Sequence, residues 1–96
     1  MYFITTLKIE NQKIIDSRTV GYYSKEKDAI ECVKNNYCDL NECGAYNYIV
    51  IENIPEGIYN YDFKPQWFEW NKSKNNFCKC SIPEGFESNS TSYSIG

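Results

Sequence analysis

The chain contains no histidine. Histidine is the commonest general base at neutral pH and the commonest metal ligand, so its absence excludes the usual catalytic triads and the His-based zinc hydrolases. The sequence has a single arginine, Arg18, and a formal net charge of −3 from 10 Lys and Arg against 13 Asp and Glu. This balance disfavours electrostatic binding of duplex nucleic acid, and it is too mild for a mimic of DNA.

Long apolar runs are also missing. No segment approaches the roughly 18 apolar residues that a membrane span needs. The first ten residues (MYFITTLKIE) lack both the basic region and the apolar block of a signal peptide. We therefore expect a cytoplasmic protein without membrane contact. Its 96 residues predict one domain over 1–96, whose small core leaves room for a large site only at the surface or between subunits.

Cysteine is present but in a pattern that favours neither disulfides nor metal. The five cysteines are an odd number, which with a reducing compartment predicts free thiols. A four-thiolate zinc site is conceivable, but Cys78 and Cys80 are separated by one residue, whereas zinc knuckles use two or more. A nucleophilic cysteine would lack a histidine to activate it. We expect no metal and no cofactor.

The N-terminal half predicts a hairpin followed by a helix. Aromatic and β-branched residues over 2–9, a polar turn at 10–13 and a second strand over 14–23, with an irregularity at Asp16-Ser17, form the hairpin. Ser24 offers an N-cap for a helix over 25–36, with acidic residues in its first turn. Its apolar stripe comprises Ala29, Ile30, Val33 and Tyr37, and its polar side comprises Lys25, Lys27, Glu31 and Lys34.

The C-terminal half predicts strands over 46–52, 58–61, 66–71 and 77–82. The run Ile49-Val50-Ile51 is typical of a central strand buried on both faces. Residues 85–96 are rich in Ser and Thr and form a tail or an edge segment, which Phe86, Tyr93 and Ile95 could hold in place. The fold class is α+β, one helix on a mainly antiparallel sheet in the order ββαβββ.

Several segments resemble a group of short uncharacterised proteins of Firmicutes genomes, prophages and phages. The resemblance rests on Gly21-Tyr22-Tyr23, residues 46–52 (YNYIVIE), 56–59 (EGIY) and 67–70 (WFEW), and the terminal Ile95-Gly96. It covers most of the chain. It carries no assigned activity and no site residue, and it implies a mobile-element setting in the cytoplasm of a host cell, where small proteins often inhibit host immunity.

Aromatic residues make up 17% of the sequence, too many for a small core to absorb. Alternation places Tyr46 and Tyr48 on the same face of one strand, and Tyr59 and Tyr61 on the same face of another. On the strand over 66–71 it places Trp67 and Glu69 on one face and Phe68 and Trp70 on the other, so that either Trp67 or Trp70 points outward. Exposed Tyr and Trp bind partner proteins and stack on bases. The alternative is an aromatic core with a homodimer interface.

A nucleotide would also need cations for its phosphates. The candidates are Arg18, Lys64, Lys72, Lys74 and Lys79, and Arg18 is the most suggestive because its planar fork grips phosphate in two places. An ordinary ion pair is the alternative for Arg18. The predicted ligand-binding set is Arg18, Tyr46, Tyr48, Tyr59, Tyr61, Trp67 and Trp70.

Catalysis by carboxylates is the remaining enzymatic route, with Glu52, Asp62 and Glu69 as candidates. Nothing in their spacing selects a pair, and a Glu that follows a buried strand is more often solvated or bound to a backbone amide. We expect a binding protein and not an enzyme.

The leading hypothesis is an anti-defence protein, acting as a homo-oligomer, that sequesters a small nucleotide immune signal. The alternatives are an inhibitor that binds a bacterial immune effector, such as an anti-CRISPR, and a structural or regulatory phage protein.

Overall fold

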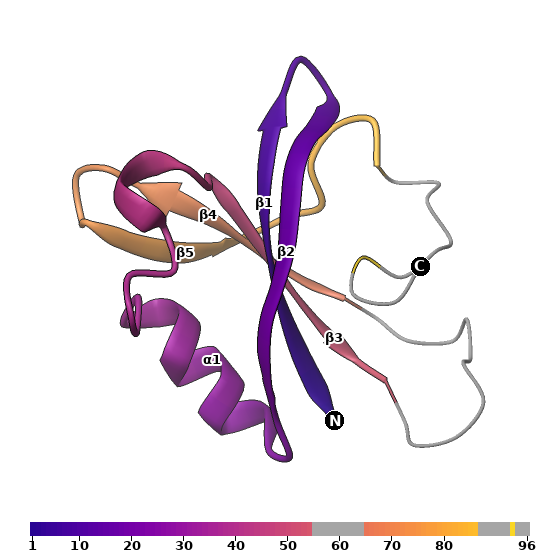
Figure 1. Cartoon of the computed structure of the whole chain (residues 1–96), viewed down its shortest axis with the longest axis vertical. Coiled ribbons are helices and arrows are strands. Elements are labelled where there is room, and N and C mark those ends of the chain that lie inside the picture. The colour runs from indigo at the N-terminus through magenta and orange to yellow at the C-terminus, as the bar shows by residue number, and fades with distance from the viewer. Residues whose placement is uncertain (55–64, 87–92, 94–96) are drawn as a thin grey trace.

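The computed structural model describes residues 1–54, 65–86 and 93 (Figure 1). In these residues the elements are β1 (Tyr2–Glu10), β2 (Lys13–Tyr23), α1 (Glu26–Lys34), a short 3-10 helix η1 (Glu42–Gly44), β3 (Tyr48–Asn53), β4 (Gln66–Asn71) and β5 (Asn76–Cys80). The five strands form one antiparallel sheet in the order β2-β1-β3-β4-β5. The predicted α+β class and element order are confirmed, and the predicted strand at 58–61 lies outside the described residues.

The opening hairpin forms as predicted. Glu10 pairs with Lys13, so the turn consists of two residues, Asn11 and Gln12, which both have positive φ (52° and 63°). This is the geometry of a type I′ turn, whose twist matches that of the strands it joins. Shifts in the β1–β2 register leave Ile15 and Val20 of β2 without an opposite residue in β1. The predicted irregularity at Asp16-Ser17 therefore falls one residue earlier, at Ile15.

The helix is shorter than its predicted range of 25–36. Its cap position is Lys25, and no side chain caps its N-terminus, so the predicted role of Ser24 is wrong. At the other end Asn36 has a φ of 49°, which stops the helical path. Tyr37 consequently lies beyond the helix and is 45% exposed instead of extending the apolar stripe. Cys32 takes its place among the buried residues of α1.

The sheet has two covered faces. On the helix face, α1 packs over a cluster of Ile4, Ala29, Cys32, Val33, Leu40, Ile49, Ile51, Phe68 and Phe77. The opposite face, here called the C-terminal face, holds Leu7, Ile9, Val50, Trp67 and Phe86. Since Ile49 and Ile51 point to one face and Val50 to the other, β3 is the doubly buried central strand that was predicted. It begins at Tyr48, two residues after the predicted start.

Phe86 and Tyr93 cover part of the second face through particular contacts. The ring of Trp67 lies 6.2 Å from that of Phe86 and 5.1 Å from that of Tyr93. The carboxylate of Glu52, which is fully buried, accepts two hydrogen bonds from the backbone N–H of Tyr93 at 3.1 and 2.9 Å. Phe86 and Tyr93 are therefore anchored on this face, as predicted, while Ile95 lies outside the described residues.

Candidate functional site

Arg18 lies on β2, which is an edge strand of the sheet. Its guanidinium forms an ion pair with Glu42 of η1 at 3.5 Å, and its side chain is 62% exposed. On the same strand Asp16 accepts a hydrogen bond of 3.3 Å from the hydroxyl of Tyr46. Burial and the Asp16 carboxylate raise the pKa of Tyr46. The chain between α1 and β3 is thus fastened to β2 by polar contacts.

Asparagine side chains fold this connecting segment. The backbone N–H of Asn41 donates to Asn36 at 3.0 Å, while the Asn41 side chain accepts from the N–H of Gly44 at 2.8 Å and donates to the carbonyl of Tyr46 at 2.5 Å. Short amide side chains can replace backbone partners in this way, which allows a tight path. Asn41 is itself buried, so the segment is anchored from inside.

The same segment carries unusual backbone strain. Positive φ angles occur at five of its non-glycine residues: Asn36 (49°), Cys38 (55°), Asp39 (55°), Glu42 (49°) and Cys43 (56°). The left-handed region is tolerated by Asn and Asp but is costly for the other side chains. Strained residues of this kind concentrate at binding sites, where the surrounding structure holds them in place. This observation points to the segment facing β2 as a candidate site.

A groove runs between β2 and this segment. Its first part is a pocket of about 530 Å³ lined by Ile4, Val20, Gly21, Tyr22, Tyr23, Cys32, Tyr37, Cys38 and Leu40. The second part, of about 500 Å³, is lined by Arg18, Val20, Cys38, Asp39, Leu40, Glu42 and Cys43. Because Val20, Cys38 and Leu40 line both parts, the two adjoin, and we call them together the β2 groove. Each part lies within the roughly 300–1,000 Å³ typical of small-ligand sites.

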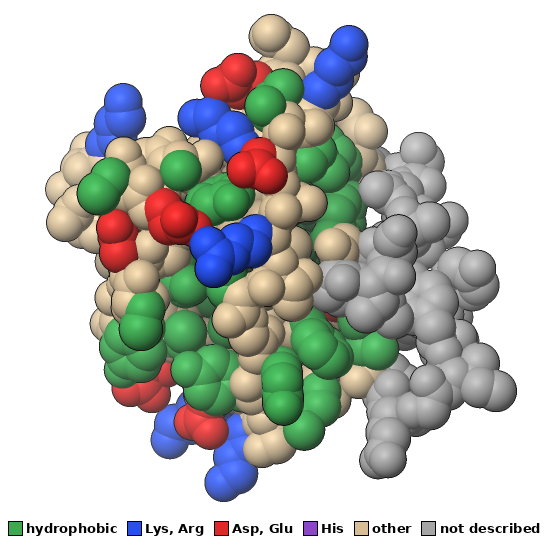
Figure 2. Space-filling model, in the orientation of Figure 1, with side chains coloured by type: hydrophobic (Ala, Val, Ile, Leu, Met, Phe, Trp, Pro, Cys, Tyr) green, Lys and Arg blue, Asp and Glu red, His purple; other side chains and the backbone are tan. Residues whose placement is uncertain are grey.

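The β2 groove is aromatic at one end and charged at the other. Tyr37 is 45% exposed, and Tyr23 is half-buried on the same face of the sheet. Tyr22 lines the groove from the same strand, but its ring packs on Phe3 of the other face, at 5.5 Å between ring centroids. Figure 2 shows hydrophobic side chains gathered over α1 and the lower part of β2, with basic and acidic side chains together above them. Arg18 is the cation of the charged end, opposite Asp39 and Glu42. This arrangement suits a ligand with a flat apolar part and a polar part.

The titrating groups of the groove favour binding over nucleophilic chemistry. A hydrogen bond with Cys32 and the charges nearby raise the pKa of Tyr23 to about 12, so its hydroxyl is a proton donor at neutral pH. A hydrogen bond to Asp39 raises the pKa of the Cys43 thiol, which keeps it protonated. Since the thiolate is the reactive form of cysteine, Cys43 is not an activated nucleophile.

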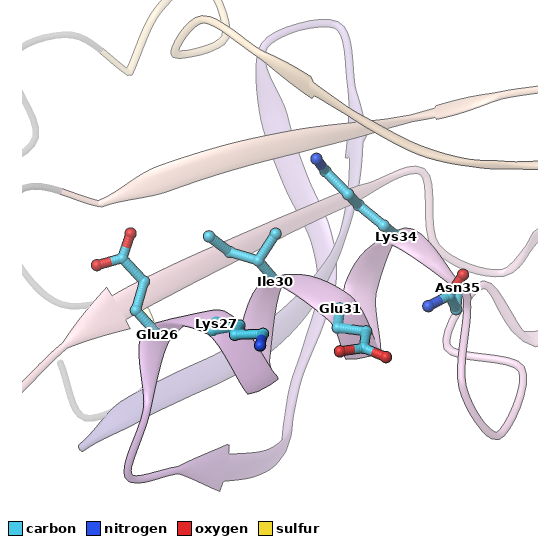
Figure 3. Close-up of a pocket in the computed structure, with 6 residues that line it drawn as sticks. All are labelled: Glu26, Lys27, Ile30, Glu31, Lys34 and Asn35. Carbon is cyan, nitrogen blue, oxygen red and sulfur yellow. The ribbon is translucent and has the colours of Figure 1, made fainter.

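A second pocket, of about 610 Å³, lies on the outer side of α1 (Figure 3). Glu26, Ile30 and Lys34 point from the helix toward β4, where Glu26 accepts a hydrogen bond of 3.2 Å from the side chain of Gln66. Ile30 is its one apolar lining residue, and the others are charged or amide side chains of a solvated helix face: Glu26, Lys27, Glu31, Lys34 and Asn35. This pocket lacks the aromatic wall of the β2 groove, so we regard it as the weaker candidate.

The structure separates most of the predicted binding residues. Tyr46 and Trp67 are buried, at 6% and 3% exposure. Trp70 is half-buried and packs edge-on against Phe77 at 5.0 Å between ring centroids. The prediction that Trp67 or Trp70 points outward is therefore wrong, because Phe86 and Tyr93 cover Trp67 and Trp70 packs against the helix-face core.

The remaining members of the predicted set are Arg18, Tyr48, Tyr59 and Tyr61. Tyr48 lies on the C-terminal face, where its hydroxyl donates to Glu69 at 2.9 Å. Tyr59 and Tyr61 lie outside the described residues. Of the described members of the predicted set, Arg18 lies near Tyr46, whose hydroxyl binds Asp16, and Tyr48 packs against the cluster that contains the buried Trp67.

Sequence reasoning left three groove tyrosines, Tyr22, Tyr23 and Tyr37, out of the predicted set. Tyr22 and Tyr23 end the second strand of the predicted hairpin, but the sequence did not show that this strand lies at the edge of the sheet or that Tyr23 faces the groove. Tyr37 was assigned to the helix stripe, so its exposure could not be foreseen. The side chains of Tyr23, Tyr37 and Arg18 define the candidate site.

Comparison with models of protein families, with curated proteins and with solved structures finds no match to this chain. The resemblance to short phage and prophage proteins therefore stays a prediction. Among the described residues no helix is long and apolar enough to cross a membrane, and no group of three or more Cys, Asp or Glu side chains could hold a metal ion. All five cysteines are free thiols.

Proposed function

We propose that this protein binds a small nucleotide in the β2 groove. The supporting observation is that the two parts of the groove adjoin, one lined by Tyr23 and Tyr37 and the other by the single arginine of the sequence, Arg18. Tyrosine rings stack on bases of any type, and a guanidinium grips a phosphate with two parallel hydrogen bonds. The tyrosines bind the base and Arg18 the phosphate.

The charge of the groove limits the ligand. Asp39 and Glu42 flank Arg18, and Glu42 occupies one side of its guanidinium. A phosphate at Arg18 takes the place of the Glu42 carboxylate, so the exchange retains one anion at this position. A polyphosphate would meet repulsion from both carboxylates. The groove thus favours a nucleotide with one phosphate group near Arg18, such as a monophosphate or a cyclic nucleotide.

The biological role follows from the resemblance and not from the groove. In a phage or prophage setting, a small protein that binds a nucleotide signal tightly would lower its free concentration in the host cell and counteract defence. Sequestration requires no catalysis, and the protonated tyrosine and thiol side chains of the groove are consistent with binding alone.

A thermal-shift assay with a panel of mono-, oligo- and cyclic nucleotides tests this proposal. A ligand that binds only the folded state, at 100 times its Kd, stabilises it by about 2.7 kcal/mol. We expect a clear rise in melting temperature for at least one nucleotide, lost in Tyr37→Ala and Arg18→Gln. Tyr48→Phe, which changes a tyrosine on the opposite face of the sheet, should retain it. No shift with any nucleotide at millimolar concentration overturns the proposal.

A protein partner is the second candidate, favoured by the apolar side chains that β2 exposes. Ile15 is 61% exposed and Tyr22 is 60% exposed. A photo-crosslinker at position 15 that joins one defined host protein, with no nucleotide-induced thermal shift, would favour this candidate. The absence of a specific crosslink would count against it.

A further inference from the structure

The outer edge of β2 is a long strand edge without a partner in the described structure. β2 spans 11 residues at the end of the sheet order β2-β1-β3-β4-β5, and β5 at the other end spans five. An edge strand presents a row of unpaired N–H and C=O groups, which another strand can bind. In Figure 1 β1 and β2 form a long twisted ribbon that extends beyond the rest of the sheet.

Exposed apolar side chains concentrate on this strand. Ile14, Ile15, Val20 and Tyr22 are between 36% and 61% exposed, and they are four of the six large hydrophobic side chains exposed in the described residues. Exposed apolar groups that cluster on one element mark an interaction surface. In the described residues, β2 is therefore paired along one edge only, and it exposes the apolar side chains of Ile14, Ile15 and Val20.

The charges of β2 are complementary to those of a second copy of the same strand. In an antiparallel pair with its two-fold axis at Ser17, Asp16 lies opposite the partner's Arg18, and the symmetry repeats this ion pair. Asp16 and Arg18 are two residues apart, so their side chains share one face of the strand. The same register places Ile14 near the partner's Val20 and Ile15 near the partner's Thr19.

Neighbouring registers are unfavourable. An axis at Asp16 would place two aspartates opposite each other, and an axis at Arg18 would place two arginines opposite each other. Like charges directly opposite destabilise a strand pair. The register shifts at Ile15 and Val20 also leave Asp16–Thr19 as the regular stretch of β2, and this stretch contains the Ser17 axis.

We propose that the protein forms a two-fold symmetric dimer in which the β2 strands of two copies pair antiparallel about Ser17. The two sheets join into one, and the dimer closes because it uses the long edge of both copies. Arg18 keeps donors for Glu42 while it meets the partner's Asp16, since a guanidinium has five N–H groups. The two β2 grooves then lie on the same face of the joined sheet, one on each side of the axis.

Charge-reversal variants of Asp16 and Arg18 test the proposed register of the β2–β2 pair. Light scattering after gel filtration, over about 10–200 µM and without nucleotide, should show a dimer for the natural sequence. D16R alone places arginines opposite each other, and R18D alone places aspartates opposite each other, so each variant should dimerise at least about 10-fold more weakly. An equimolar mixture of D16R and R18D restores both ion pairs and should form heterodimers, and the double variant D16R/R18D should pair with itself.

Controls keep the result specific. Glu31→Arg, a charge reversal on the exposed side of α1, should leave the dimer intact. Circular dichroism must show that D16R and R18D are folded, because Asp16 also binds Tyr46 and Arg18 also binds Glu42. A monomer at all concentrations overturns the proposal, and so does a dimer that both single variants retain.

A measurement on the natural sequence does not depend on any variant. Amide hydrogen exchange in β2 should slow as protein concentration rises from about 1 to 200 µM, while exchange in β4 should not change. Unchanged exchange in β2 contradicts the proposal. Dimerisation is measured without nucleotide and nucleotide binding is measured with Tyr37→Ala, so either proposal can fail while the other holds.

Discussion

At the scale of single residues, Asn47 joins three strands although it lies just outside β3. Its side-chain oxygen accepts the N–H of Ile9, and its side-chain N–H₂ donates to the carbonyl of Ile9, both at 2.9 Å. Its backbone N–H donates to Leu7 at 3.1 Å, and its carbonyl accepts from Trp70 at 2.9 Å. Because β3 begins one residue later, the Asn47 amide takes the place of the strand residue that Ile9 would otherwise pair with.

Asn47→Ala should therefore destabilise the protein more than its half-buried position suggests. It removes two side-chain hydrogen bonds and leaves the backbone of Ile9 without these partners, at a cost of about 1 kcal/mol for each bond. We expect the free energy of unfolding, measured by urea denaturation, to fall by about 2–3 kcal/mol. Asn53→Ala, at an exposed position of β3, is the control and should change it by less than about 0.5 kcal/mol. Equal losses in the two variants would contradict the role of Asn47.

Residue-level chemistry shows which part of the site the sequence could predict. Arg18 was identified because it is the single arginine, and its pairing with Glu42 is the ordinary ion pair that was the alternative. The burial of Trp67 could not be predicted, since its cover comes from Phe86 and Tyr93, which lie 19 and 26 residues later in the chain. Alternation along a strand assigns a side chain to a face but does not show what covers that face.

At the scale of elements, the hairpin turn is the place where local sequence and local geometry disagree. Asn11 suits the first position of a type I′ turn, but the second position, with a φ of 63°, is occupied by Gln12 where Gly is preferred. The side chain of Gln12 lies against Gly85, where an added Cβ would come within 3.3 Å of it. Gln12 therefore adopts a costly backbone conformation while it contacts the C-terminal segment.

Gln12→Gly should stabilise the protein if backbone strain outweighs this contact. Replacing a non-glycine residue in the left-handed region by glycine removes backbone strain and raises the free energy of unfolding by about 0.5–1 kcal/mol. This corresponds to a rise of about 2–8 °C in the melting temperature of a small domain. Gln12→Ala is the matched control, because it removes the contact with Gly85 and keeps the strain, and it should show no rise. A lower melting temperature for Gln12→Gly than for the natural sequence would mean that the contact is the larger effect.

The presence of the helix and the strands was predicted better than the residues at which they begin and end. The hairpin, the central strand and the strand at 66–71 follow from alternation and turn residues, which act locally, and the strand predicted at 77–82 lies at Asn76–Cys80. The helix ends at Lys34 because Asn36 adopts positive φ, and Asn36 does so while its side chain accepts a hydrogen bond from Asn41. A boundary that is set by a contact with a later residue is not visible in local spacing.

At the scale of the whole molecule, the sheet is held by different chemistry on its two faces. The helix face is mainly aliphatic and aromatic, with Tyr23 at its border. The C-terminal face includes Tyr48, whose hydroxyl binds Glu69. Burial and this hydrogen bond raise the pKa of Tyr48 to about 12, and the hydrogen bond with Cys32 raises the pKa of Tyr23 to the same value. Both faces therefore depend on a protonated tyrosine.

The stability of the whole fold should accordingly fall at alkaline pH. A group whose pKa is higher in the folded state contributes stability that is complete below its unfolded pKa and is lost as pH rises through its folded pKa. For Tyr23 and Tyr48 this interval runs from about pH 10 to about 12. Urea denaturation at pH 9, 10, 11 and 12, with reductant present, should show an unfolding free energy that is level up to pH 10 and then decreases.

Variants at these two tyrosines identify the source of the decrease. Tyr48→Phe and Tyr23→Phe should each lower the stability at pH 9, because each removes a hydroxyl that has a partner, and each should flatten the decrease between pH 10 and 12. The double variant should flatten it further, since the two side chains lie on opposite faces of the sheet and act independently. A decrease of the same steepness in the double variant would show that other groups, such as the Cys80 thiol, whose burial raises its pKa to about 11, control alkaline unfolding.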